Sequence, residues 1–150
     1  MKQTTCKQPL YKLLALVVLC LSMFSFTAER GLDRYEIYLN NKLILKQAVN
    51  SPLNLRKLQL SNSQSDDRLR IFYTHCTNKG VGTGRSIAIE DEKGNVLKKW
   101  TFKDDDKGME IPVKELLQVE KKNADRELSL HYVAQELHEG DMMLASVQFK

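Results

Sequence analysis

Residues 87–102 read IAIEDEKGNVLKKWTF and contain the clearest β-hairpin signal in this chain of 150 residues. Ile87 and Ile89 alternate with other residue types, which is the two-residue period of a half-buried strand. The charged segment 91–95 then supplies a turn that contains glycine, and Val96, Trp100 and Phe102 share one parity beyond it. We therefore predict two antiparallel strands here, with Trp100 facing the core.

The same two-residue period recurs on both sides of this hairpin. Around the pair Asn40-Asn41, whose residues tolerate positive φ, it predicts an earlier hairpin over residues 35–49. A change of parity between Leu55 and Leu58 predicts a bulge or register change near residues 56–57. Further alternating segments lie at residues 69–74, 128–134 and 145–149. Seven or eight short strands joined by polar turns indicate an antiparallel β-sandwich or a small barrel.

One segment departs from the β period. In residues 112–123, PVKELLQVEKKN, the apolar Val113, Leu116 and Leu117 follow the i, i+3, i+4 spacing of an amphipathic helix. Pro112 suits the first helical position, and the two lysines 121–122 favour the helix C-terminus. We expect one short helix within a single β-rich domain that covers residues 29–150.

Residues 1–28 have the three parts of a secretory signal peptide. Residues 1–12 contain three lysines and no acidic residue. An apolar run follows directly over residues 13–26. This run is shorter than the roughly 18–20 residues that span a bilayer. Cleavage after Thr27 or Ala28 gives an exported protein, periplasmic or secreted. If the segment is kept, it anchors the chain, and this is the only membrane contact that we expect.

Removal of this segment changes what the composition indicates. The whole chain has 23 Lys and Arg against 19 Asp and Glu, but residues 29–150 have 20 basic and 19 acidic side chains. The pI near 8.9 is therefore no sign of nucleic-acid binding. Of the three cysteines, only Cys76 lies beyond residue 28. One cysteine forms no internal disulfide, so a disulfide-rich scaffold is excluded.

Cys76 is the first candidate for a catalytic residue. A thiolate nucleophile needs a base nearby, often a histidine that is distant in sequence. His75 adjoins Cys76, but neighbours on one strand point to opposite faces, so His131 on a later strand is the better candidate. A free, partly buried thiol at a strand end is the preferred interpretation. An intermolecular disulfide is a further alternative.

Residues 78–85, NKGVGTGR, form a glycine-rich segment in which Gly82, Gly84 and Arg85 are candidates for ligand binding. Exposed backbone amides beside a guanidinium can bind an anion. A phosphate-binding loop, however, opens onto a helix N-terminus, and here a strand follows. We therefore prefer a crossover loop between two strands.

The acidic turn before Gly108 is the remaining candidate for a metal site. Asp104 and Asp106 could contribute oxygen atoms to Ca²⁺, which takes six to eight such ligands. Their spacing does not match an EF-hand, so a solvated turn is the preferred interpretation. His131 and His138 also lack the spacing of a known zinc motif. We expect no metal and no cofactor.

A signal segment, a β framework and no recognisable catalytic motif together favour a non-enzymatic function. The leading hypothesis is an exported domain that binds a protein or a surface polymer, and no nucleic acid. The alternative is a small exported enzyme or thiol protein that uses Cys76 with a histidine such as His131. A hydrogen bond between the Cys76 sulfur and an imidazole would favour the alternative.

Overall fold

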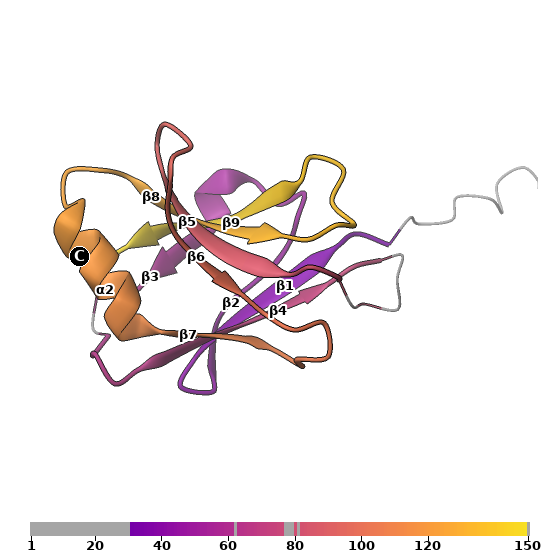
Figure 1. Cartoon of the computed structure of the whole chain (residues 1–150), viewed down its shortest axis with the longest axis horizontal. Coiled ribbons are helices and arrows are strands. Elements are labelled where there is room, and N and C mark those ends of the chain that lie inside the picture. Colours follow the sequence, from indigo (N-terminus) through magenta and orange to yellow (C-terminus); the bar gives the residue numbers. More distant parts are fainter. Residues whose placement is uncertain (1–30, 62, 77–79, 81, 150) are drawn as a thin grey trace, which may run out of the picture. The chain divides into compact units, whose positions relative to one another are not determined.

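The computed structural model describes residues 31–61, 63–76, 80 and 82–149 (Figure 1). Over these residues the chain forms nine strands in two sheets, with one α-helix and a short 3₁₀ helix. The two sheets do not close into a barrel, and the β-sandwich-like architecture predicted from the sequence is confirmed. In the same residues no helix has the length and apolarity needed to cross a membrane. The predicted signal segment lies outside the described residues.

The first sheet is antiparallel, and its central strands carry one side of the core. Asn40 and Asn41 adopt the positive φ values of 47° and 68° that a tight hairpin turn requires, which confirms the predicted turn between the first two strands. Phe72, on the opposite face from the core residues of its strand, makes an edge contact with Tyr38. The strand order is β2 (Lys42–Ala48), β1 (Arg34–Leu39), β4 (Arg68–Thr74) and β7 (Met109–Pro112).

The second sheet is mixed, because its first strand pairs in parallel with the last strand of the chain. A 3₁₀ turn, η2 (Leu53–Leu55), precedes that first strand and ends just before residues 56–57, where the sequence predicts a bulge or register change. Leu53 and Leu55 are exposed, whereas Leu58 is buried. The strand order is β3 (Lys57–Gln59), β9 (Asp141–Gln148), β8 (Leu128–Val133), β5 (Ser86–Asp91) and β6 (Val96–Thr101).

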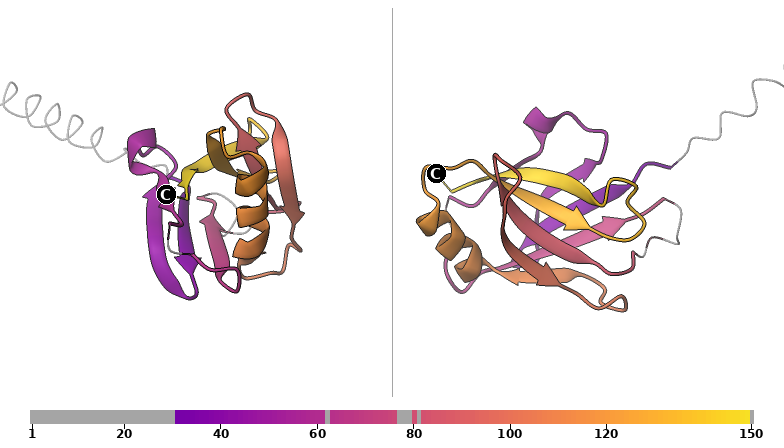
Figure 2. Two further views of the ribbon diagram at one scale, coloured as in Figure 1. Left: turned by 90° about the vertical axis from the view of Figure 1, so that its left-hand side faces the viewer. Right: turned by 45° about the horizontal axis from the view of Figure 1, so that its top comes forward.

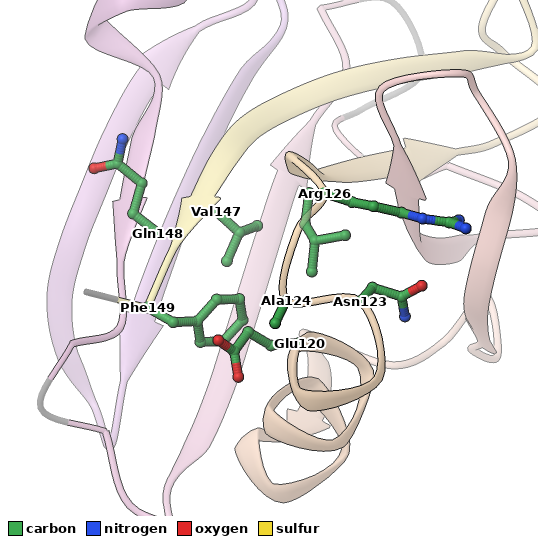
Figure 3. A pocket seen from close by; sticks show the side chains of 8 residues that line it. Glu120, Asn123, Ala124, Arg126, Val147, Gln148 and Phe149 are labelled. Carbon is green, nitrogen blue, oxygen red and sulfur yellow. The ribbon is translucent and has the colours of Figure 1, made fainter.

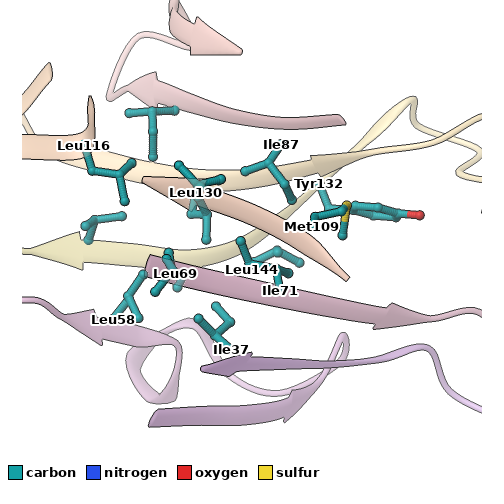
Figure 4. Packing of buried hydrophobic residues seen from close by; sticks show 14 of the residues in the cluster. Ile37, Leu58, Leu69, Ile71, Ile87, Met109, Leu116, Leu130, Tyr132 and Leu144 are labelled. Atoms are coloured by element: carbon teal, nitrogen blue, oxygen red, sulfur yellow. The ribbon is translucent and has the colours of Figure 1, made fainter. Parts of the chain in front are cut away.

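The core lies between the two sheets, which form separate layers in Figure 2. Alternate residues of the central strands point into it, as the two-residue period predicts. Figure 4 shows apolar side chains from both layers meeting there, and the labelled members are Ile37, Leu58, Leu69, Ile71, Ile87, Met109, Leu116, Leu130, Tyr132 and Leu144.

The β5–β6 hairpin forms as predicted, but its second strand lies differently from our expectation. A register shift opposite Ile89 and Glu90 places Val96 across from Glu90, and Val96 is 56% exposed. Trp100 pairs with the buried Ile87 and packs against the margin of the core. The prediction that Trp100 faces the core is confirmed, although its side chain is only half-buried because β6 is an edge strand.

Helix α2 (Val113–Lys122) lies beside the edges of the two sheets, as Figures 1 and 2 show. It follows directly from β7, and Pro112 is its N-cap residue rather than its first helical residue. Its apolar stripe buries Val113, Leu116 and Val119. From its first turn Glu115 accepts a hydrogen bond from Trp100 Nε1 at 2.9 Å and pairs with Lys98 at 3.0 Å. The helix therefore connects the β7 edge to the β6 edge.

Candidate functional site

A cleft of about 360 Å³ lies at the end of the sandwich where β1 begins and the β8–β9 loop turns. Figure 1 shows these two segments at the same end of the sheets. We call it the acidic cleft. Three chain segments meet there: the residue before β1, the residues that follow β4, and the loop between β8 and β9. It is lined by Asp33, His75, Cys76, Glu136, Leu137, His138, Glu139, Asp141 and Met142.

Among the described residues that line the acidic cleft, four carry carboxylates and none is a lysine or arginine. Burial raises the pKa of Asp33, but hydrogen bonds from the Cys76 backbone and the Tyr73 hydroxyl outweigh it, so the pKa lies below its usual value. Glu136 behaves in the same way, since donors from Thr83 overcome the effect of burial on its pKa. Both groups are therefore negatively charged at neutral pH, and the cleft favours a cation.

A buried polar network forms the floor of the acidic cleft and joins the two sheets. The His75 side chain is 1% exposed, and its Nδ1 lies 3.2 Å from an Asp33 carboxylate oxygen. Its Nε2 lies 3.0 Å from the hydroxyl of Tyr132 on β8. The Tyr73 hydroxyl donates to the same Asp33 oxygen at 2.9 Å. Both ring nitrogens of His75 are therefore occupied, and the imidazole acts as a fixed structural link rather than a free base.

Two aromatic rings and one glycine hold this network in place. The rings of Tyr73 and Tyr132 stack with centroids 4.1 Å apart, and burial raises the pKa of both phenols. Gly82 packs directly against the network, because a Cβ atom there would lie 2.3 Å from the Tyr132 oxygen and 2.7 Å from His75 Nε2. Gly82, a candidate for anion binding, is thus required here by close packing.

Cys76 lines the acidic cleft as an exposed free thiol, not as the partly buried thiol that we expected. Its neighbour is the Asp33 carboxylate, which accepts a hydrogen bond from the Cys76 backbone amide at 2.9 Å. Desolvation and this carboxylate raise the pKa of the thiol. Activation of a cysteine nucleophile needs the opposite shift.

His131 makes its hydrogen bonds away from Cys76. It lies on β8 with a parity opposite to the buried Leu130 and Tyr132, so it points to the outer face of the second sheet. Its Nδ1 lies 2.6 Å from an Asp141 oxygen, and its Nε2 lies 2.9 Å from the Ser129 hydroxyl. In the part of the chain that the structure describes, no hydrogen bond joins the Cys76 sulfur to an imidazole.

The amides of the glycine-rich loop bind carboxylates of the protein itself. The Thr83 amide donates to Glu136 at 2.9 Å, and the Gly84 amide donates to Asp104 at 2.8 Å. Arg85 is buried, and its guanidinium donates to the backbone carbonyls of Lys103 and Asp106. The Thr83 and Gly84 amides and one guanidinium nitrogen of Arg85 are thus engaged within the fold.

The turn that contains Asp104 and Asp106 is organised by the same contacts. Asp106 accepts a hydrogen bond from the Lys103 amide at 3.0 Å, while Asp104 holds the Gly84 amide. The two carboxylates therefore serve different backbone donors. Among the described residues the group of side chains with the spacing of a metal site is a different one, formed by Glu90, His131 and Asp141.

A second cleft, of about 350 Å³, lies between the C-terminal end of α2 and the end of β9 (Figure 3). Phe149 and Ala124 line it together with polar side chains such as Glu120. Its one arginine, Arg126, pairs with Asp91 at 2.8 Å. The described residues that line this cleft are of mixed character and contain no cluster of groups suited to proton transfer, so it is the weaker candidate.

The sequence indicated only part of the acidic cleft. It makes Cys76 a candidate, but it does not bring together Asp33, His75, Glu136, Glu139 and Asp141. The one local signal is the density of acidic residues in 136–141, ELHEGD.

Comparison with protein-family models, with curated proteins and with solved structures found no significant match to this chain.

Proposed function

We propose that this protein is an exported, non-enzymatic binding domain whose acidic cleft accepts a positively charged group of a partner protein. The observation that supports the proposal is the lining of the cleft, where four carboxylates converge and the described part of the chain contributes no lysine or arginine. A cationic side chain would gain both charge attraction and hydrogen-bond acceptors there. Export is supported by the n-region and apolar run of residues 1–28.

The alternative of a thiol enzyme has less support. The Cys76 thiol has no imidazole partner among the described residues, and its pKa is raised rather than lowered. His75 is buried and already bonded on both ring nitrogens. A binding function needs neither residue to change its protonation state.

The binding proposal is tested by NMR titration of the protein with tri-lysine. We expect shifts confined to residues of the acidic cleft, weaker binding at higher salt, and no binding of tri-glutamate. Glu139→Gln should weaken binding several-fold, because this exposed carboxylate lines the cleft. The control is Glu92→Gln, an exposed glutamate in the turn at the opposite end of β5. Equal affinity of the two variants would contradict the proposal, as would preferential binding of a neutral surface polymer.

Export is tested separately by mass spectrometry of the protein recovered from membrane and soluble envelope fractions. Cleavage predicts a mature N-terminus between Ala28 and Arg30. Full-length chains confined to the membrane would show instead that residues 1–28 are an anchor.

A further inference from the structure

The outer face of the second sheet carries a cluster of ligating side chains, of which only Asp141 also lines the acidic cleft. Glu90 on β5, His131 on β8 and Asp141 at the start of β9 each offer one donor atom, and these atoms lie within 4.8 Å of one another. The strands pair directly, with Glu90 opposite Ser129 on β8. The cluster is thus mounted on a rigid part of the sheet.

We propose that Glu90 and His131 bind a divalent transition-metal ion of the zinc class, with Asp141 as the residue that positions the imidazole. Imidazole nitrogen and carboxylate oxygen together suit Zn²⁺, whereas Mg²⁺ and Ca²⁺ prefer oxygen alone.

The hydrogen bond between Asp141 and His131 selects the ring nitrogen that faces the metal. The Asp141 carboxylate lies 2.6 Å from Nδ1, so Nδ1 carries the proton, and the lone pair of Nε2, which now faces the Ser129 hydroxyl, is the one that a metal would use. A carboxylate that holds the far nitrogen of a histidine ligand is the usual support of such sites in proteins, and it makes the imidazole a better donor.

The distance between the two ligand atoms fits one metal ion. Glu90 Oε2 lies 3.8 Å from His131 Nε2. Two ligands at about 2.0–2.2 Å from a tetrahedral zinc lie about 3.4 Å from each other, so only a small movement is needed. The Ser129 hydroxyl, which lies 2.9 Å from Nε2, would turn away from the metal. It can still donate to the Glu90 carbonyl oxygen, which lies 3.4 Å from the hydroxyl.

The environment of Glu90 is the second observation that points to a cation. Its side chain is only 15% exposed, yet among the described residues its carboxylate makes no hydrogen bond and has one ion-pair partner, His131 at 3.8 Å. A carboxylate removed this far from water needs a counter-charge. A bound metal ion would supply it.

The order of hydrogen bonds Ser129–His131–Asp141 also resembles that of a hydrolytic triad, but the surroundings favour a metal. Strand β8 lies between β5 and β9, so its backbone amides are used in the sheet and offer no oxyanion hole. The Glu90 carboxylate beside Nε2 would oppose a developing negative charge. The negative charge of the Glu90 carboxylate instead attracts a cation.

The site is tested by calorimetric titration of the full chain with ZnCl₂, without a histidine tag and with Cys6, Cys20 and Cys76 replaced by serine so that thiolates do not compete. We expect one zinc per chain. His131→Ala should abolish binding, Glu90→Gln should weaken it at least tenfold, and Asp141→Ala should weaken it 10–100-fold.

The matched control is His138→Ala, which removes an exposed histidine that lines the acidic cleft. It should leave zinc affinity unchanged. Zinc should also shift the imidazole NMR signals of His131 and not those of His138. Absence of binding, or loss of binding in His138→Ala but not in His131→Ala, would overturn the proposal. If His131→Ala fails to fold, Asp141→Ala decides the question, because that carboxylate is 42% exposed.

Discussion

At the scale of single residues, Asp91 shows how one carboxylate fixes a turn. It ends β5, its side chain is fully buried, and it accepts hydrogen bonds from the amides of Lys93 and Asn95 and from the Asn95 side chain. These bonds, together with the Arg126 guanidinium, lower the pKa of Asp91 to about 2. The charged form is therefore part of the folded structure.

This shift predicts a loss of stability in acid. In the unfolded chain the pKa of an aspartate is about 3.9, so the contribution of Asp91 is complete above pH 4 and is lost as pH falls toward 2. Asp91→Asn should lower the free energy of unfolding at pH 7 and make its dependence on pH between 4 and 2 less steep. Urea melts at several pH values measure both effects. Glu92→Gln, at the exposed neighbouring position, should change neither.

The Cys76 thiol provides a second test at this scale. Because desolvation and the Asp33 carboxylate raise its pKa, Cys76 should react slowly with iodoacetamide at pH 7, although it is exposed. The rate should rise with pH to a midpoint above the ordinary pKa of a thiol. A midpoint below 8 would contradict this account and would support the thiol-enzyme alternative.

At the scale of elements, the strands and the helix were predictable where one face is buried and the other is solvated. Ile37, Leu69, Ile71 and Leu130 all point into the core on the parity that the sequence indicated. Strand β7 was missed because Met109–Pro112 is too short to show a period. The bulge in β6 is not visible in the sequence because the extra residue, Leu97, follows the apolar Val96 and extends the apolar start of the strand.

The bulge and the edge position of β6 determine how much Trp100 contributes to the free energy of unfolding. It packs against the margin of the core and donates a hydrogen bond to Glu115 on α2. Full burial of a tryptophan makes its truncation cost about 3–5 kcal/mol, so half-burial should reduce the cost of Trp100→Ala to about 2–3 kcal/mol.

Trp100→Phe separates the two contributions, since it removes the hydrogen bond and keeps most of the apolar contact. It should cost about 0.5–1.5 kcal/mol. Lys99→Ala on the exposed neighbouring position should cost roughly 0.5 kcal/mol or less. Urea melts of the three variants measure these differences. If Trp100→Ala is no more destabilising than Lys99→Ala, the contact between β6 and α2 is not important for stability.

At the scale of the whole molecule, the acidic cleft and the outer-face cluster depend on contacts that a sequence does not show. Asp33 and His75 lie 42 positions apart in the chain but meet because β1 and β4 pair along their whole length. Glu90, His131 and Asp141 meet because β5, β8 and β9 are neighbours in one sheet. Strand period identifies the face of each residue, whereas strand order and register decide which faces come together.

The stability of the fold is also a property of the whole molecule. Residues 31–150 contain a single cysteine, so the packing between the two sheets must supply the stability. Ile71 is fully buried at the centre of the core, and Ile71→Ala should cost about 2–5 kcal/mol, whereas Ile71→Val should cost about 0.5–1.5 kcal/mol. Leu53→Ala is the control: its side chain is 58% exposed on η2, and its truncation should cost roughly 0.5 kcal/mol or less. The free energies come from urea melts.

Melting temperatures of residues 31–150 with and without reductant should agree, because a β-sandwich held by its core has no cross-link to lose. A clear decrease in reductant would mean that Cys76 joins two chains and that the dimer, rather than the single core, sets the stability.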